Sequence, residues 1–211
     1  LNYGSGSPTK GVGGDKTRSA KLSYFGRVGY DFGGRYMLQA SLRADAADLA
    51  MLPSTNRWGY FPAVSAGWSI SEEKFFEPLK QHVSSLKLRA SWGQNGSLAA
   101  LGGYAYSTDM SLGYIYAFTP GNNYITGAHP TSMGNDNLKW ETSEQINVGL
   151  DARFFNDRLT FSLDYFDKKT KDLLVNGRTP SLIIGGTTSP MNAGNVSNKG
   201  WELELGWRDH I

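Results

Sequence analysis

Period-two alternation of apolar and polar residues dominates the sequence and most constrains its fold. In residues 22–32, for example, Tyr24 and Val28 fall on one face, whereas Arg27 and Asp31 fall on the other. Successive side chains of a β-strand point to opposite sides of a sheet, so each such segment predicts a strand with one apolar face. The alternating segments are residues 22–32, 36–45, 58–70, 86–93, 140–154, 159–165 and 201–207. An all-β fold, built as an antiparallel meander, is therefore predicted.

The connections between these segments differ sharply in length. Gly33-Gly34 and Asn156-Asp157 are short hairpin signals, and residues 72–82 predict a helical turn within a link of intermediate length. The three long connections are residues 46–57, 95–139 and about 175–199. Compact soluble domains rarely carry structureless loops beyond about 15 residues. Short turns at one end and long loops at the other are typical of an outer-membrane β-barrel.

Composition excludes several classes of protein. The chain has no cysteine, which excludes disulfides, thiolate metal sites and cysteine nucleophiles. Its net charge is only +2 and its basic residues form no run, so no nucleic-acid partner is expected. No apolar run approaches the roughly 18 residues of a transmembrane helix. The strands of a membrane β-barrel remain compatible, because they are apolar on one face only.

Tryptophan lies near the ends of the alternating segments, and its amphipathic ring favours the boundary between lipid and water. Trp58 and Trp68 are ten residues apart, about 33 Å of strand, which projects to about 25 Å when tilted by about 40°. That is the height of the apolar band of a barrel. Trp201 and Trp207 are closer together, so they fit this band only in part. The expected membrane-interface aromatics are Trp58, Trp68, Trp140, Trp201 and Trp207.

The longest connection is the candidate substrate-binding region. It concentrates aromatic rings, which stack on sugar faces, and amides, which pair with hydroxyl groups. The predicted binding residues are Tyr104, Tyr114, Tyr116, Asn122, Asn123 and Tyr124. The same aromatics could instead pack the loop against itself or against a second subunit, and this alternative stays open.

No catalytic or metal site is predicted. Glu202 and Glu204 share a strand face and are the strongest carboxylate pair for a glycoside hydrolase, but a solvated polar row explains them better. The three histidines show no ligand spacing, and no nucleophile-elbow motif is present. We expect neither a cofactor nor a metal, and no enzymatic activity. Two rival interpretations remain: a soluble carbohydrate-binding β-sandwich and a β-rich glycoside hydrolase.

Several sequence blocks, in a specific order and spacing, carry a family resemblance. They are YMLQASLRAD at residues 36–45, RWGYFPAVSAGWSISEE at 57–73, SLKLRASWGQNG at 85–96, NLKWE at 137–141, NVGLD at 147–151, TKDLL at 170–174 and NKGWE at 198–202. In these blocks the chain resembles the barrel region of the SusC/RagA family of TonB-dependent outer-membrane transporters, typical of Bacteroidetes.

The resemblance implies a large barrel of the 22-stranded type in the bacterial outer membrane. Residues 1–211 would then be a partial barrel segment of about seven strands, with the plug and N-terminal domains outside this chain. It further implies uptake of oligosaccharides or, alternatively, of peptides. The implied partners are a SusD-like surface lipoprotein, TonB acting through parts absent from this chain, and outer-membrane lipid.

Overall fold

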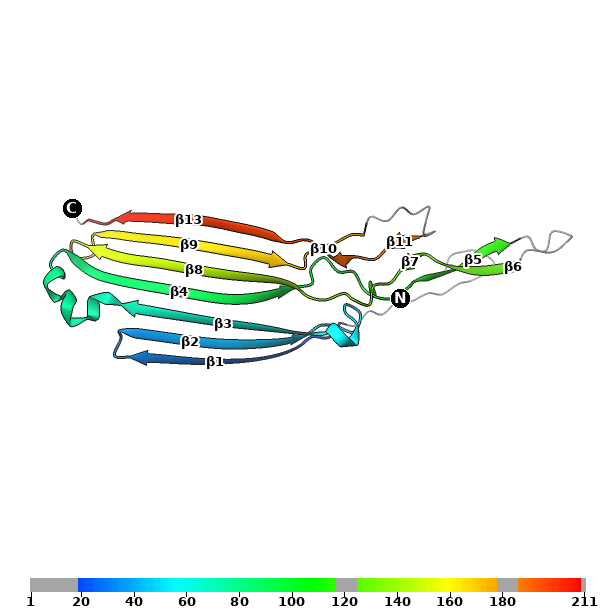
Figure 1. The fold of residues 1–211 in the computed structure, drawn as a ribbon, viewed down its shortest axis with the longest axis horizontal. Coiled ribbons are helices and arrows are strands. Elements are labelled where there is room, and N and C mark those ends of the chain that lie inside the picture. Colours follow the sequence, from blue (N-terminus) through cyan, green and yellow to red (C-terminus); the bar gives the residue numbers. More distant parts are fainter. Residues whose placement is uncertain (1–18, 117–124, 178–185, 210–211) are drawn as a thin grey trace, which may run out of the picture.

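The computed structural model describes residues 19–116, 125–177 and 186–209, and within them one large antiparallel sheet dominates (Figure 1). Its seven strands follow the order β1-β2-β3-β4-β8-β9-β13, so that sequential long strands are neighbours. They are β1 (Leu22–Phe32), β2 (Tyr36–Ala46), β3 (Trp58–Ser69), β4 (Val83–Ser97), β8 (Glu141–Phe154), β9 (Leu159–Lys171) and β13 (Val196–Trp207). The predicted all-β antiparallel meander is confirmed.

Three strands extend further than the alternation predicts. β4 continues to Ser97, β9 continues to Lys171, and β13 begins at Val196 rather than at Trp201. The added stretch of β9 reads Phe166-Asp167-Lys168-Lys169-Thr170-Lys171, which is polar on both faces beyond Phe166. Because neither face is apolar there, period two disappears from the sequence although the hydrogen-bonded ladder continues.

The short connections lie together at one end of the sheet, here called the turn end. Gly33 and Gly34 both have positive φ (60° and 68°), as the predicted two-residue hairpin requires. The β3–β4 link forms two 3₁₀ helices, η2 (Ile70–Glu72) and η3 (Lys74–Leu79), where a helical turn is predicted. Between them, the carboxylate of Glu73 accepts hydrogen bonds from the Tyr36 hydroxyl and the Trp68 indole.

The long connections lie at the opposite end, here called the loop end, where small elements extend past the sheet (Figure 1). β5 (Met110–Tyr116) and β6 (Ile125–Pro130) form an antiparallel pair. A parallel pair joins β7 (Ser132–Met133) to β11 (Thr187–Thr188), and an antiparallel pair joins β10 (Leu174–Val175) to β12 (Met191–Asn192). A single 3₁₀ turn, η1 (Ser54–Asn56), precedes β3. The long connections therefore carry secondary structure of their own.

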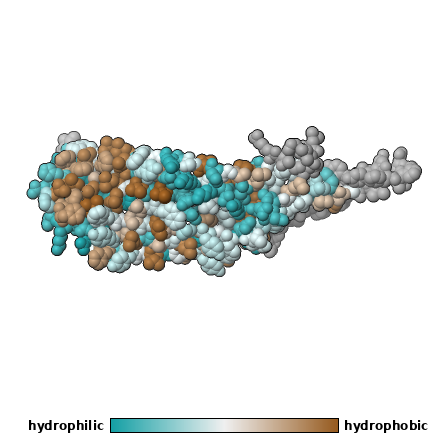
Figure 2. Space-filling model, in the orientation of Figure 1, coloured by the Kyte–Doolittle hydropathy of each residue, from teal (hydrophilic) through white to brown (hydrophobic). Residues whose placement is uncertain are grey.

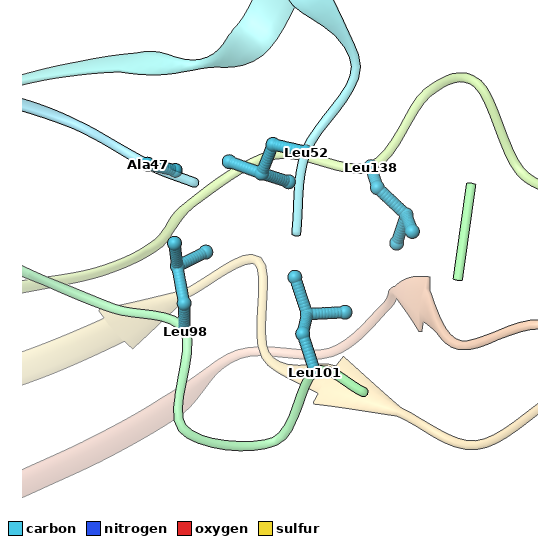
Figure 3. Close-up of a cluster of buried hydrophobic side chains, with 5 residues drawn as sticks. All are labelled: Ala47, Leu52, Leu98, Leu101 and Leu138. Atoms are coloured by element: carbon cyan, nitrogen blue, oxygen red, sulfur yellow. The ribbon is translucent and has the colours of Figure 1, made fainter. Parts of the chain in front are cut away.

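Buried apolar side chains gather at the loop end rather than on the sheet. This loop-end core consists of Ala47, Leu52, Leu98, Leu101 and Leu138 (Figure 3), and both Leu52 and Leu138 are completely buried. Its members come from the β2–β3 and β4–β5 connections and from the segment before β8. Residues far apart in the sequence thus fix the three connections against one another.

The large apolar side chains of the sheet are exposed. Trp201 is 70% exposed, Leu203 61% and Val28 74%. Within the described residues the only other sheets are the two-stranded pairs, so no second sheet packs on this face. The β-sandwich alternative is therefore wrong, since it requires these side chains to meet a second sheet in a dry interior.

Candidate functional site

One face of the sheet, here called the apolar face, carries most of the large hydrophobic side chains. The strand register aligns Phe32, Tyr36, Trp68, Leu88, Leu150, Leu163 and Leu203 in one row across all seven strands. Neighbouring rows bring Val64, Trp92 and Ile146 side by side, and an apolar groove crosses β1 to β8 at this level. Exposed hydrocarbon on this scale marks a surface that contacts a membrane or another protein.

The apolar band runs at a slant to the strands. On β1 the last aromatic toward the loop end, Tyr24, lies eight residues from the aligned row, whereas on β13 Trp201 lies only two residues from it. This offset of six residues is about 20 Å along the strands, over a sheet width of about 29 Å for seven strands. The slope of about 35° matches the tilt of strands in a membrane barrel.

Aromatic pairs mark both borders of the band. Tyr24 stacks on Trp58 at the loop-end border, with ring centroids 6.1 Å apart, and Tyr36 stacks on Trp68 at the turn-end border, 6.3 Å apart. On β9 and β13 the loop-end border is formed by Tyr165 and Trp201, 4.8 Å apart. Figure 2 shows hydrophobic side chains over the turn-end part of the sheet and hydrophilic ones toward its loop end.

The opposite face, here called the polar face, carries a three-strand ion network. The Arg89 guanidinium contacts Asp151 with Nε–Oδ2 of 2.7 Å and Asp164 with Nη2–Oδ2 of 2.8 Å. The Ser162 hydroxyl donates to Asp151 at 2.7 Å. Gly149 lies between Arg89 and Asp164 in the register, and a Cβ there would collide with both side chains. The missing side chain of Gly149 therefore lets Arg89 cross β8 to reach β9.

At the loop end of the polar face, an aromatic contact joins the sheet to the loop-end core. Phe61 is buried and meets the Trp140 ring edge-to-face, with centroids 5.5 Å apart. The Trp140 indole N–H donates to the Arg57 carbonyl at 3.1 Å. A side chain at Gly96 would collide with Phe61, so that glycine makes room for the ring. This contact fixes the position of the long loops relative to the strands.

Polar side chains hold the long connections together. The Asn56 amide donates to the Leu138 carbonyl at 3.0 Å, and Asn192 bonds to both backbone groups of Lys139. Asp48 accepts backbone N–H bonds from Ala50 (3.0 Å) and Ala20 (2.7 Å). These donors, first that of Ala50, lower the pKa of the Asp48 carboxyl, because they stabilise its charged form.

The structure locates only part of the predicted substrate-binding set. Tyr104 lies in the β4–β5 connection with an exposed side chain, near the Tyr106 ring. Tyr114 and Tyr116 belong to β5. Asn122, Asn123 and Tyr124 lie outside the described residues. Glu202 and Glu204, the carboxylates weighed for a hydrolase, face Asp164 and Ser162 across β13 and β9 and are exposed on the polar face.

The predicted interface tryptophans do not share one environment. Trp58, Trp201 and Trp207 are exposed, and all three lie in the rows of the apolar face, as Trp68 does. Trp140 instead packs against Phe61 and the loop-end core. The sequence reasoning did not anticipate Asp48, Asn56 or Asn192 as loop ties. The only available signal was Asx residues in the connections, which favour local backbone bonds.

Within the described residues, no helix is long and apolar enough to cross a membrane, and no three histidine, aspartate or glutamate side chains are grouped to hold a metal ion.

Comparison with known proteins agrees with this architecture. The family model described as "TonB dependent receptor-like, beta-barrel" matches residues 1–209. The chain belongs to this family. Among its relatives, TonB-dependent receptor P39 of Formosa agariphila is 36% identical over 92% of this chain, and TonB-dependent receptor SusC of Bacteroides thetaiotaomicron is 35% identical over 90%. The resemblance to SusC-type receptors predicted from the sequence blocks is thus confirmed.

Solved structures share the fold of the chain. The RagAB peptide importer in its closed-closed state matches 90% of the chain with a TM-score of 0.75 at 28% identity. The siderophore receptor PirA of Pseudomonas aeruginosa shares the fold, with a TM-score of 0.55. The chain spans about a fifth of the length of the SusC-type relatives and of the RagAB match: 18% of P39 and of SusC, and 20% of the RagAB chain.

Proposed function

We propose that this chain forms part of the wall of a TonB-dependent outer-membrane importer that takes up nutrient oligomers. The observation that carries the proposal is the opposite character of the two sheet faces. One exposes a slanted apolar band bordered by aromatic pairs, and the other exposes the Arg89–Asp151–Asp164 network. The first suits acyl chains and the second suits a wet lumen. The chain would therefore cross the outer membrane many times as a β-barrel.

In this proposal the chain binds and passes its substrate without converting it. The polar face offers ion pairs, hydroxyls and amides, which contact a solute through reversible hydrogen bonds and electrostatics. Energy would come through TonB, acting on parts of the protein outside residues 1–211. A SusD-like surface lipoprotein is the proposed partner at the loop end. There the packed loop-end core holds the long connections in place, so that they can form a contact surface for it.

Oligosaccharides are the preferred substrate class. Tyr104 presents an exposed ring beyond the sheet, where a sugar can stack on it. Tyr114 and Tyr116 of β5, with Asn122, Asn123 and Tyr124, complete the proposed binding set. Peptides are the second candidate, because the RagAB structure that the chain resembles is described as that of a peptide importer.

Uptake by the full-length protein distinguishes the two substrates. A deletion strain complemented with the gene should grow on an oligosaccharide mixture and not on a peptide mixture as sole carbon source. Growth on peptides alone would show that the substrates are peptides rather than oligosaccharides. Growth on neither mixture, with a correctly inserted protein, would overturn the importer proposal.

The role of Tyr104 has a matched control in the neighbouring tyrosine. Tyr104→Ala should weaken binding of the growth-supporting oligosaccharide by up to about tenfold, through lost stacking. Tyr106→Phe removes a hydroxyl that donates to the Leu49 carbonyl, a contact within the loops, and should leave affinity unchanged. Equal affinities of wild type and Tyr104→Ala in calorimetry would remove Tyr104 from the binding set.

A further inference from the structure

The apolar face ends, toward the loops, in a group of charged side chains on β8, β9 and β13. Period two places Lys169 and Lys171 on the same side of β9 as Tyr165, and Lys199 on the same side of β13 as Trp201. Asp167 and Glu144 share this face. The three lysines are here called the lysine cluster. They point to the same side as the side chains assigned to lipid, and away from the proposed lumen.

Within the lysine cluster, the carboxylates are covered and the ammonium groups are open. Lys199 Nζ lies 3.1 Å from Asp167 Oδ2, and Lys171 Nζ lies 2.9 Å from Glu144 Oε2. The side chains of Asp167 and Glu144 are only 14% and 25% exposed, whereas those of Lys199 and Lys171 are 54% and 53% exposed. An ammonium group has three donors, so each lysine keeps donors for another acceptor.

The lysine cluster also carries a surplus of positive charge. Lys169 shares Asp167 with Lys199, at 3.6 Å, so three lysines face two carboxylates. The second oxygen of Glu144 accepts from the Trp92 indole at 2.8 Å, which ties the carboxylate to a side chain of the apolar groove. An anion that approaches this face therefore meets exposed donors, while the negative charges lie beneath them.

The height of the cluster indicates which anion it can meet. Lys199 precedes Trp201 by two residues on the same face, which places it about 7 Å nearer the loop end along the strand. Aromatic rings at this border lie at the level of lipid head groups, so the next side chains lie among the head-group phosphates. Basic residues at this depth attract anionic head groups, by about 1 kcal/mol per lysine, which corresponds to about fivefold in affinity.

We propose that Lys169, Lys171 and Lys199 form a binding site for the phosphate groups of lipids in the leaflet on the loop side. The proposal rests on the membrane placement of the apolar face given above. The phosphate would lie between the three ammonium groups, and the acyl chains would run along the apolar band below. Such a site would fix the depth at which β9 and β13 lie in the membrane.

The test uses the full-length protein purified in detergent and native mass spectrometry. The probes are lipid A and lipid A without its phosphates. Wild-type protein should retain lipid A and discriminate against the dephosphorylated form. The variant Lys169→Gln, Lys171→Gln, Lys199→Gln should lose more than about tenfold in lipid A affinity. Excess inorganic phosphate should not displace the lipid, because the acyl chains contribute to binding.

Matched variants keep the outcome interpretable. Lys87→Gln with Lys168→Gln changes lysines of the polar face and should retain wild-type affinity. Replacing the three cluster lysines by arginine keeps the charge and should also retain it. Equal retention of lipid A by the wild type and the triple Gln variant would overturn the lipid site, while membrane insertion and uptake would remain intact. Capture of a protein partner by the cluster in place of lipid would overturn it as well.

Discussion

The loop-end core and the apolar face contain the same kinds of side chain in opposite surroundings. Leu52 and Leu138 are completely buried by other parts of the chain, whereas Leu203 and Leu205 are more than 60% exposed. Burial of a leucine removes it from water at a gain of about 1.5–3 kcal/mol, so both groups must be covered. The protein covers the first group itself, and in the proposed barrel acyl chains cover the second.

This difference separates two sources of stability. The loop-end core makes the long connections a small folded unit, held by side-chain and backbone bonds between distant segments. Few apolar side chains of the sheet are buried within the chain, and in the proposed barrel the sheet depends on its hydrogen-bonded ladder, its polar-face ion network and the surrounding lipid. Changes in the loop-end core should therefore act locally, whereas changes on the apolar face should act on membrane insertion.

The largest expected effect comes from emptying the loop-end core. Leu138→Ala removes a completely buried side chain and should destabilise the loop end by about 2–5 kcal/mol. Limited proteolysis of the full-length protein should cut residues 98–140 faster, while the barrel stays resistant. The exposed Leu112 gives the matched control, since Leu112→Ala should change nothing. Equal cleavage of both variants would show that the connections are not one packed unit.

A charge on the apolar face should have the next largest effect. Leu203→Arg places a guanidinium in the apolar band and should cost about 2–4 kcal/mol, with less folded barrel in the outer membrane. Glu202→Arg, one residue away on the polar face, should be tolerated. Heat modifiability of the two variants on gels measures the folded fraction. Better folding of Leu203→Arg than of Glu202→Arg would reverse the assignment of the two faces.

Filling the gap at Gly149 should have a moderate effect. A side chain there displaces Arg89 or Asp164, so Gly149→Val should destabilise the barrel by about 1–3 kcal/mol. Gly26→Val provides the control, because a Cβ at Gly26 meets nothing within 4 Å. Unfolding in urea, in the presence of lipid, compares the two. Identical midpoints would mean that the ion network contributes nothing measurable.

The smallest effect concerns the acid sensitivity of the loop end. The pKa of Asp48 is lowered in the folded state, so its contribution is complete above the unfolded pKa, near 4, and is lost as pH falls through the lower folded pKa. A fluorophore at the exposed position Leu49→Cys should report loop opening below about pH 4. Asp48→Asn should remove this transition. An unchanged acid transition in Asp48→Asn would assign it to another group.

The sequence predicts the sheet well and the loop end poorly, for physical reasons. Alternation is visible only where one face of a strand is apolar. It therefore predicts the bounds of β1, β2 and β3 to within one residue, but it misses the polar ends of β9 and β13. The loop-end core is assembled from Leu52, Leu98 and Leu138, whose proximity depends on long-range packing that no local period encodes. The contact of Trp140 with Phe61 is likewise not encoded by the local pattern that places Trp140 at a strand end.

The two charged clusters, the Arg89 network and the lysine cluster, also differ in how far the sequence predicts them. The Arg89 network could be foreseen as charge on a polar face, but its geometry depends on Gly149 and on the register of three strands. The lysine cluster gives no sequence signal, because Lys168 and Lys169 look like one solvated run until the strand separates them onto opposite faces.

In the proposed barrel, adjacent residues of β13 face lipid and water in turn, and spin labels on two neighbouring positions can distinguish these surroundings. The chain contains no cysteine, so single spin labels can be placed here without removing native thiols from this segment. In the full-length protein reconstituted in lipid, a label at Leu205→Cys should collide mainly with oxygen, and a label at Glu204→Cys mainly with a water-soluble nickel reagent. If the label at residue 205 were shielded from both reagents, or reached only by nickel, the apolar face would not be covered by acyl chains.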